Sequence, residues 1–119
     1  MTSVLNVDSI AAKDGTSPVE LTKQSAAKAW ARYDGSSVLA DSFNVTSTVD
    51  GATTGQTTVN FTNSMSDSNY AAQATCNGTS GDRFTTIGGQ TASALDTFTF
   101  DGSTRTDLPV GTMVSGDLA

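Results

Sequence analysis

The chain has 119 residues, a formal net charge of −6 and no histidine, and this length fits one domain of ordinary size. Only six residues are Lys or Arg, so the chain lacks the clustered cations that bind a phosphate backbone, and nucleic acid is not an expected partner. No apolar run approaches the ~18 residues of a membrane span, and no Sec-type signal peptide is visible. Membrane insertion is therefore not expected.

The residue composition favours strands and turns over helices. About 35 residues are Ser or Thr, well above average usage, and 11 are Gly. We therefore predict an all-β fold, namely an antiparallel β-sandwich or partly open barrel of about seven or eight short strands.

The first quarter of the chain is predicted to differ from the rest. Residues 4–10 form a short strand with Leu5 and Val7 on one face, a turn follows at Asp14-Gly15, and residues 18–21 are extended. Residues 22–28 are Ala-rich and predict a helical turn or two before a strand from Trp30 to Tyr33. We assign residues 1–25 to an N-terminal extended arm that docks on a partner, and residues 26–119 to the β-sandwich domain.

Alternating apolar residues indicate the remaining strands, which turn signals separate every ~8–15 residues. Phe43, Val45 and Val49 share one parity in a β-branched run. Val59 and Phe61 alternate with polar residues, as do Phe98 and Phe100. Further strands are expected at residues 70–76, 83–87 and 110–115. The predicted core residues are Trp30, Tyr33, Phe43, Val45, Val59, Phe61, Tyr70, Phe84, Ile87, Phe98, Phe100, Val110 and Val114.

This core is thin for the number of residues that it must order, because ordering each residue costs about 1.5 kcal/mol. Oligomerisation would bury more apolar area. We therefore expect the chain to assemble with itself, as a homotrimer or as part of a lattice.

No enzyme motif is present. General acid–base chemistry has no histidine to use, and the Asp residues that precede Gly at Asp14, Asp34, Asp50 and Asp101 are explained by turns. The chain has neither a Gly-x-Ser-x-Gly sequence nor a P-loop lysine. No run of alternating Asp residues suggests calcium, and the lone Cys76 is interpreted as a small buried hydrophobe. We expect no catalytic residues, no cofactor and no metal.

Aromatic residues could instead bind a sugar. Trp30, Tyr33 and Tyr70 are the candidates, although packing in the core is the favoured interpretation for each. A carbohydrate-binding module is therefore a distant alternative, and its distinguishing sign would be exposed, coplanar aromatic side chains.

An ordered series of segments resembles small tail-fibre-like virion proteins of marine tailed bacteriophages. The resemblance covers most of the chain and is weaker from residue 74 to 106. Its segments are residues 5–10 (LNVDSI), 15–21 (GTSPVEL), 26–30 (AAKAW), 41–47 (DSFNVTS), 58–62 (TVNFT), 65–71 (MSDSNYA) and 116–119 (GDLA).

The resemblance implies a non-enzymatic surface component of the virion that takes part in host attachment. Many tail fibres carry a long trimeric shaft, which is not visible in this chain. That departure leaves open an alternative, a capsid decoration protein of the cement or head-fibre kind that stabilises the capsid shell.

Two sets of residues are the candidates for binding. Lys and Arg are concentrated in the first third of the chain, which suggests an arm that contacts an acidic surface of the tail or the major capsid protein. The loops from residue 77 to 106, which vary among the proteins that the chain resembles, would face the host, with a surface glycan as the ligand. The partner-docking candidates are Leu5, Val7, Ile10, Lys13, Lys23 and Lys28, and the host-facing loop candidates are Asn77, Thr79, Asp82 and Arg105.

Overall fold

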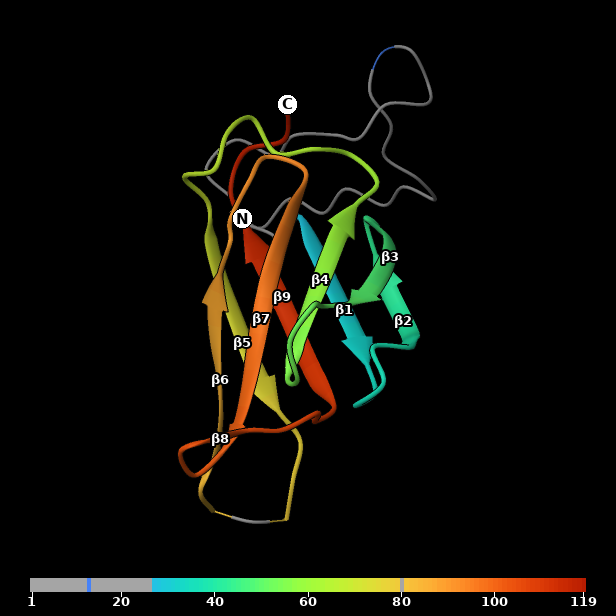
Figure 1. Ribbon diagram of the computed structural model, residues 1–119. Helices are drawn as coiled ribbons and strands as arrows, with labels where there is room; N and C mark the ends of the chain where they lie inside the picture. The colour runs from blue at the N-terminus through green and yellow to red at the C-terminus, as the bar shows by residue number, and fades with distance from the viewer. Residues whose placement is uncertain (1–12, 14–26, 80) are drawn as a thin grey trace, which may run out of the picture.

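The computed structural model describes residue 13, residues 27–79 and residues 81–119. The described chain has nine strands in two antiparallel sheets that pack face to face, and none of it is helical (Figure 1). The prediction of an all-β antiparallel sandwich is confirmed, and the sheets do not close into a barrel.

The first sheet has four strands in the order β2-β1-β9-β5. Its members are β1 (Ala29–Tyr33), β2 (Leu39–Phe43), β5 (Ala71–Cys76) and β9 (Val110–Ser115). The last strand of the chain thus lies inside the sheet, between β1 and β5.

The second sheet has the order β3-β4-β7-β6, with a short strand β8 paired to the end of β7. Its members are β3 (Val45–Asp50), β4 (Gln56–Phe61), β6 (Arg83–Gly88), β7 (Ala94–Asp101) and β8 (Thr104–Arg105). The sequence did not indicate β8, which has only two residues.

The chain turns a corner at Asn44, within the run Phe43, Val45 and Val49 that we expected to share one face of a strand. Phe43 ends β2 in the first sheet and Val45 begins β3 in the second, so the two residues do not line one continuous strand. Asn44 has a φ of 56°, in the left-handed region that Asn tolerates better than most residues. Its side-chain Nδ2 donates to the carbonyls of Lys28 (3.0 Å) and Asn63 (3.1 Å), while its Oδ1 accepts from the Asn63 N–H (2.7 Å).

Most of the predicted N-terminal structure lies outside the described residues. This holds for the strand at residues 4–10, the extended residues 18–21 and most of the helical turns expected over 22–28. Of the latter, Ala27 and Lys28 are described and neither is helical. The strand expected from Trp30 begins one residue earlier, at Ala29.

The core lies between the two sheets and is built from alternate residues of each strand. In β1, for example, Ala29, Ala31 and Tyr33 are buried while Arg32 is exposed, as period-two alternation requires. The predicted core residues that are indeed buried are Tyr33, Val45, Val59, Phe61, Tyr70, Val110 and Val114, and Ile87 packs partly buried against them.

The prediction was wrong for the other aromatic residues. Phe43 and Phe84 are 55% and 47% exposed, and Trp30, Phe98 and Phe100 are only half-buried, on the outer faces of the sheets. In β7 the inward positions belong to Leu95, Thr97 and Thr99, which are no more than 3% exposed. Residues three apart on a strand point to opposite faces, so burying Leu95 turns Phe98 outward.

Hydroxyl groups satisfy one another inside this core. The Tyr33 hydroxyl hydrogen-bonds to the hydroxyls of Thr97 (2.6 Å) and Thr112 (3.2 Å), which come from opposite sheets. The Ser37 hydroxyl similarly pairs with that of Thr57 at 2.7 Å. Because buried polar groups are costly unless they are hydrogen-bonded, these pairs explain how a Thr-rich sequence fills a sandwich interior.

Tyr33→Phe should lower the free energy of unfolding by about 1–3 kcal/mol, since it removes both hydrogen bonds of the Tyr33 hydroxyl and leaves the buried Thr112 hydroxyl without its partner.

Burial also raises the pKa of Tyr33, and that of Tyr70, above the ordinary tyrosine value of about 10. As the pH rises, the unfolded chain therefore loses its phenol protons before the folded chain does. The free energy of unfolding is thus unaffected by these groups below a pH of about 10 and falls as the pH rises above it. Urea unfolding at pH 8 and at pH 11 should show a smaller alkaline loss for Tyr33→Phe than for the native chain. An equal loss in both would contradict this assignment.

Candidate interaction surfaces

The strand directions place the loops at two opposite ends of the sandwich. Tyr33 and Cys76 both pair with Val110 at one end, whereas Ala29 pairs with Val114 at the other. We call the second end the entry end, because the chain enters β1 there, and it also holds the paired Met65 and Leu118. The first end is the loop end, and it carries the connections 34–38, 51–55, 77–82, 102–103 and 106–109 (Figure 1).

Three of the four host-facing candidates lie exposed in one connection at the loop end. These are Asn77, Thr79 and Asp82, between β5 and β6. The Asn77 N–H donates to the Pro109 carbonyl (2.8 Å), and the Asp82 carbonyl accepts from the Gly102 N–H (2.9 Å). Backbone hydrogen bonds thus join both ends of this loop to its neighbours.

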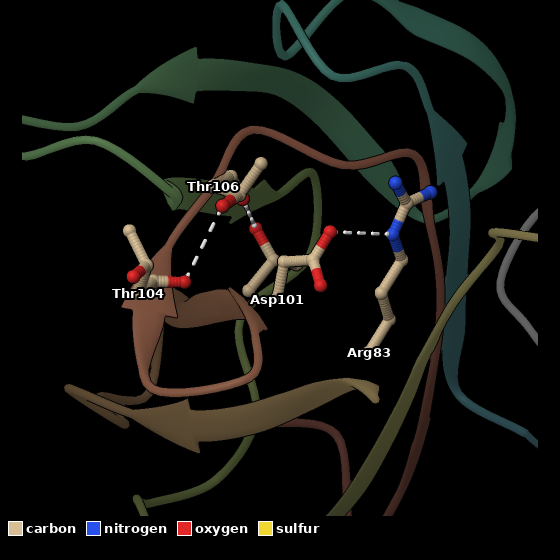
Figure 2. A network of polar contacts seen from close by, with 5 residues as sticks. Arg83, Asp101, Thr104 and Thr106 are labelled. Atoms are coloured by element: carbon tan, nitrogen blue, oxygen red, sulfur yellow. Dashed lines mark hydrogen bonds and ion pairs between the residues drawn. The ribbon is translucent and has the colours of Figure 1, made fainter. Parts of the chain in front are cut away.

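An ion pair lies next to the same connection between β5 and β6. Arg83 Nε lies 3.1 Å from Asp101 Oδ2, as Figure 2 shows. The Arg83 side chain also fills the space at Gly78, where an added Cβ would lie 2.5 Å from Arg83 Cδ. Both charged side chains are partly exposed to water, so the pair contributes at most about 1 kcal/mol. Its main effect is to position the loop.

The fourth candidate, Arg105, lies on β8 rather than in a loop, and its side chain extends over the outer face of the second sheet. Its guanidinium carbon is 4.6 Å from the centre of the Phe98 ring and 5.7 Å from that of Phe100. Arg105 Nη1 also donates to Thr53 Oγ1 at 2.7 Å. Arg105 therefore belongs to a different element from the loop that carries Asn77.

Arg105 and its aromatic neighbours form a mixed surface, which we call the aromatic face: Phe84, Phe98, Phe100 and Arg105. Phe84 and Phe100 stack with ring centres 4.8 Å apart and planes 8° apart. A guanidinium has five N–H donors in a fixed fork, so one held over aromatic rings can still donate to a ligand oxygen. Sequence reasoning missed this surface because it assigned the three Phe residues to the core.

The aromatic residues that we considered for sugar binding are mostly unavailable for it. Tyr33 is buried, and the Tyr70 hydroxyl donates to the carbonyls of Thr91 and Ala94, at 3.0 Å each. Core packing was the favoured interpretation for both, and it is confirmed. Trp30 is half-buried on the outer face of the first sheet.

Of the six docking candidates, the structure describes two. Lys13 is exposed, and Lys28 is half-buried at the entry end. The Lys28 N–H donates to the Val114 carbonyl (2.7 Å), so Lys28 fixes the start of β1 next to the Asn44 corner. Leu5, Val7, Ile10 and Lys23 lie outside the described residues.

Several aspartates serve turns and neighbouring segments. Asp34 Oδ1 accepts from the N–H groups of Ser36 and Val38, at 2.9 Å each, which confirms the turn interpretation for this residue.

Within residues 27–79 and 81–119, no three acidic or cysteine side chains gather closely enough to hold a metal ion. No helix able to span a membrane occurs in the part of the chain that the structure describes.

Comparison with protein families, curated proteins and solved structures finds no match to this chain.

Proposed function

We propose that this chain is a non-enzymatic structural protein of a tailed-phage virion, a tail-fibre-like surface component that takes part in host attachment. The observation that carries the proposal is the opposition of the two ends. The chain enters β1 through Ala27 and Lys28 at the entry end, whereas Asn77, Thr79 and Asp82 are exposed at the loop end. The ordered resemblance along the sequence supports the same proposal.

Each end has a different task in this proposal. The N-terminal arm attaches the protein to the tail or to the major capsid protein, and the sandwich holds the loop end away from that attachment. Loops carried on a rigid sandwich are a common way to build a binding surface. The chain assembles as a homotrimer, because its own core is thin.

The same arrangement also suits a capsid decoration protein. In that case the arm lies along the shell and joins neighbouring capsid subunits, and the loop end is simply the outer surface. The two candidates differ in copy number, since a shell offers far more attachment sites than a tail does.

A host glycan is the ligand class that the aromatic face supports. The half-exposed Phe84 presents ring surface, Arg105 offers donors, and the nearby Asp96 carboxylate accepts from Thr58 Oγ1 at 2.6 Å. Aromatic side chains beside fixed polar groups suit the apolar faces and hydroxyls of a sugar.

Quantitative mass spectrometry of purified particles, scaled to the major capsid protein, tests the proposal. A few copies per particle, in multiples of three or six, would support the tail component. Hundreds of copies would contradict the tail location and assign the chain to capsid decoration. Absence from the particle would contradict both and favour a free carbohydrate-binding module, for which the aromatic face is the candidate site.

A further inference from the structure

The outer face of the first sheet carries a row of apolar side chains that runs across the strands. Trp30 pairs in register with Phe43 on one side and with Met113 on the other, and Met113 pairs with Gln73. Phe43 is 55% exposed and Met113 is 51% exposed. Two large apolar side chains therefore face water in one row, on either side of the half-buried Trp30.

The neighbouring row of side chains on the same face contains a glycine inside a strand. It consists of Asp41, Arg32, Gly111 and Thr75, which are also paired in register. Gly111 lies within β9, between two partner strands, where glycine costs about 0.5–1 kcal/mol relative to alanine. Its φ is not positive, and an added Cβ would meet no atom within 4 Å. Nothing in the described part of the chain therefore requires glycine at this position.

A glycine inside a strand often marks the place where another backbone approaches closely. Gly111 and its small neighbour Thr75 keep this part of the sheet low, directly beside the apolar row. Sheets that stack face to face lie about 10 Å apart, and the side chains of their two facing surfaces interdigitate. The surface thus combines a low position at Gly111 with protruding apolar side chains beside it, and a second sheet could pack against this shape.

The charges on this face indicate which second sheet fits. Arg32 and Asp41 are cross-strand neighbours but form no ion pair with each other, and the Asp41 carboxylate accepts from the Ser42 N–H at 2.8 Å. The face therefore offers one cation and one carboxylate side by side. A partner surface of one charge sign would attract either Arg32 or Asp41 and repel the other. A second copy of this chain instead supplies a carboxylate for Arg32 and a guanidinium for Asp41.

We propose that copies of this chain associate through this surface, the β1–β9 face, which consists of Trp30, Arg32, Asp41, Phe43, Gly111 and Met113. Gly111 lies at the point of closest approach, and Arg32 of one copy faces Asp41 of the next. The inference rests on the self-assembly in the proposed function and deepens it, since it assigns a surface through which two copies meet.

The aromatic face on the other sheet does not share these features. Its glycine, Gly88, is explained by packing within the chain, because a Cβ added there would lie 2.8 Å from Cε2 of Phe98. Arg105 already lies over Phe98 and Phe100. That face nevertheless provides the matched control, since Phe84 is 47% exposed.

The oligomeric state of the full chain in solution tests the inference. Sedimentation equilibrium over a range of about 1–100 µM should show self-association of the native chain. Met113→Lys should weaken it at least tenfold, because it places an amine in the apolar row, whereas Phe84→Lys should leave it unchanged at the same net charge. A monomeric native chain, or equal weakening by the two variants, would overturn the proposal.

Gly111→Thr separates an interface role from a structural one. Threonine suits a strand better than glycine, so this variant should unfold at the same or a higher urea concentration than the native chain. Its added side chain should nevertheless weaken association at least tenfold. Association at the native strength would overturn the proposal. These measurements need no virion, so a chain found absent from particles would contradict the proposed function without affecting this test.

Discussion

Gly55→Ala is expected to lower the free energy of unfolding by about 3 kcal/mol, a large part of the stability of a small domain. Gly55 has a φ of 76°, which costs a residue with a Cβ about 1–2 kcal/mol. The new Cβ would also lie 2.6 Å from the Thr99 carbonyl oxygen and 3.1 Å from the Thr106 nitrogen, both of them backbone atoms. Crowding of this kind adds about 1–3 kcal/mol. Urea unfolding followed by circular dichroism measures the loss.

Gly102→Ala is the control for this prediction. Gly102 also has a positive φ, of 61°, but an added Cβ there meets nothing within 4 Å. The variant should therefore lose only the conformational part, about 1 kcal/mol. Equal losses for Gly55→Ala and Gly102→Ala would show that close packing at Gly55 has no energetic weight.

Gly55 is sensitive because several segments of the loop end meet at its backbone. Its N–H donates to Asp107 Oδ1 at 2.6 Å, and its carbonyl accepts from the Thr99 N–H at 2.8 Å. The Thr106 N–H in turn donates to the Thr99 carbonyl at 3.1 Å. A displacement of Gly55 would therefore disturb the β3–β4 turn and the segment that leads into β9 together.

Asn44→Ala should lower the free energy of unfolding by a similar amount, about 3 kcal/mol. The substitution removes three hydrogen bonds, each worth about 0.5–1.5 kcal/mol net, and places alanine at a left-handed φ. Asn44→Gly removes the same hydrogen bonds without the conformational cost, so we expect it to lose about 2 kcal/mol. Thermal or urea unfolding of the two variants gives the difference directly.

Asn63→Ala is the matched control at the same corner. Asn63 contacts Asn44 through its backbone N–H and carbonyl, and its exposed side chain is not part of that contact. A change within about 0.5 kcal/mol is expected, as for ordinary surface substitutions. If Asn44→Ala were equally mild, the corner would owe its shape to the flanking strands rather than to Asn44.

The sequence could predict the fold class and most strands, because alternation and Asp-Gly turns are local signals. It did not predict which face of several strands is buried. Trp30 and Tyr33 were both assigned to the core, although residues three apart on a regular strand point to opposite faces. The same conflict holds for Phe84 and Ile87. In each pair the structure buries the second residue more deeply and turns the first outward.

Long-range contacts decide these choices, and for that reason the local pattern could not. Tyr33 is inside because its hydroxyl finds Thr97 on the opposite sheet. The exposed surfaces were missed for the same reason, since Phe43 and Met113 meet only through the pairing of β1 with β2 and β9. One local signal was available, namely Gly111 within a strand predicted at residues 110–115.

The central position of β9 also governs when this protein can acquire its structure during synthesis. The final strand is the shared partner of β1 and β5, which do not pair with each other. A nascent chain that lacks β9 cannot complete the first sheet. Folding of this sheet must therefore await the synthesis of β9, and its dependence on contacts between distant residues makes it slow relative to a fold built from local hairpins. Loss of β9 would be far more damaging than its short length suggests, because β5 would lose its only partner in the sheet and β1 one of its two.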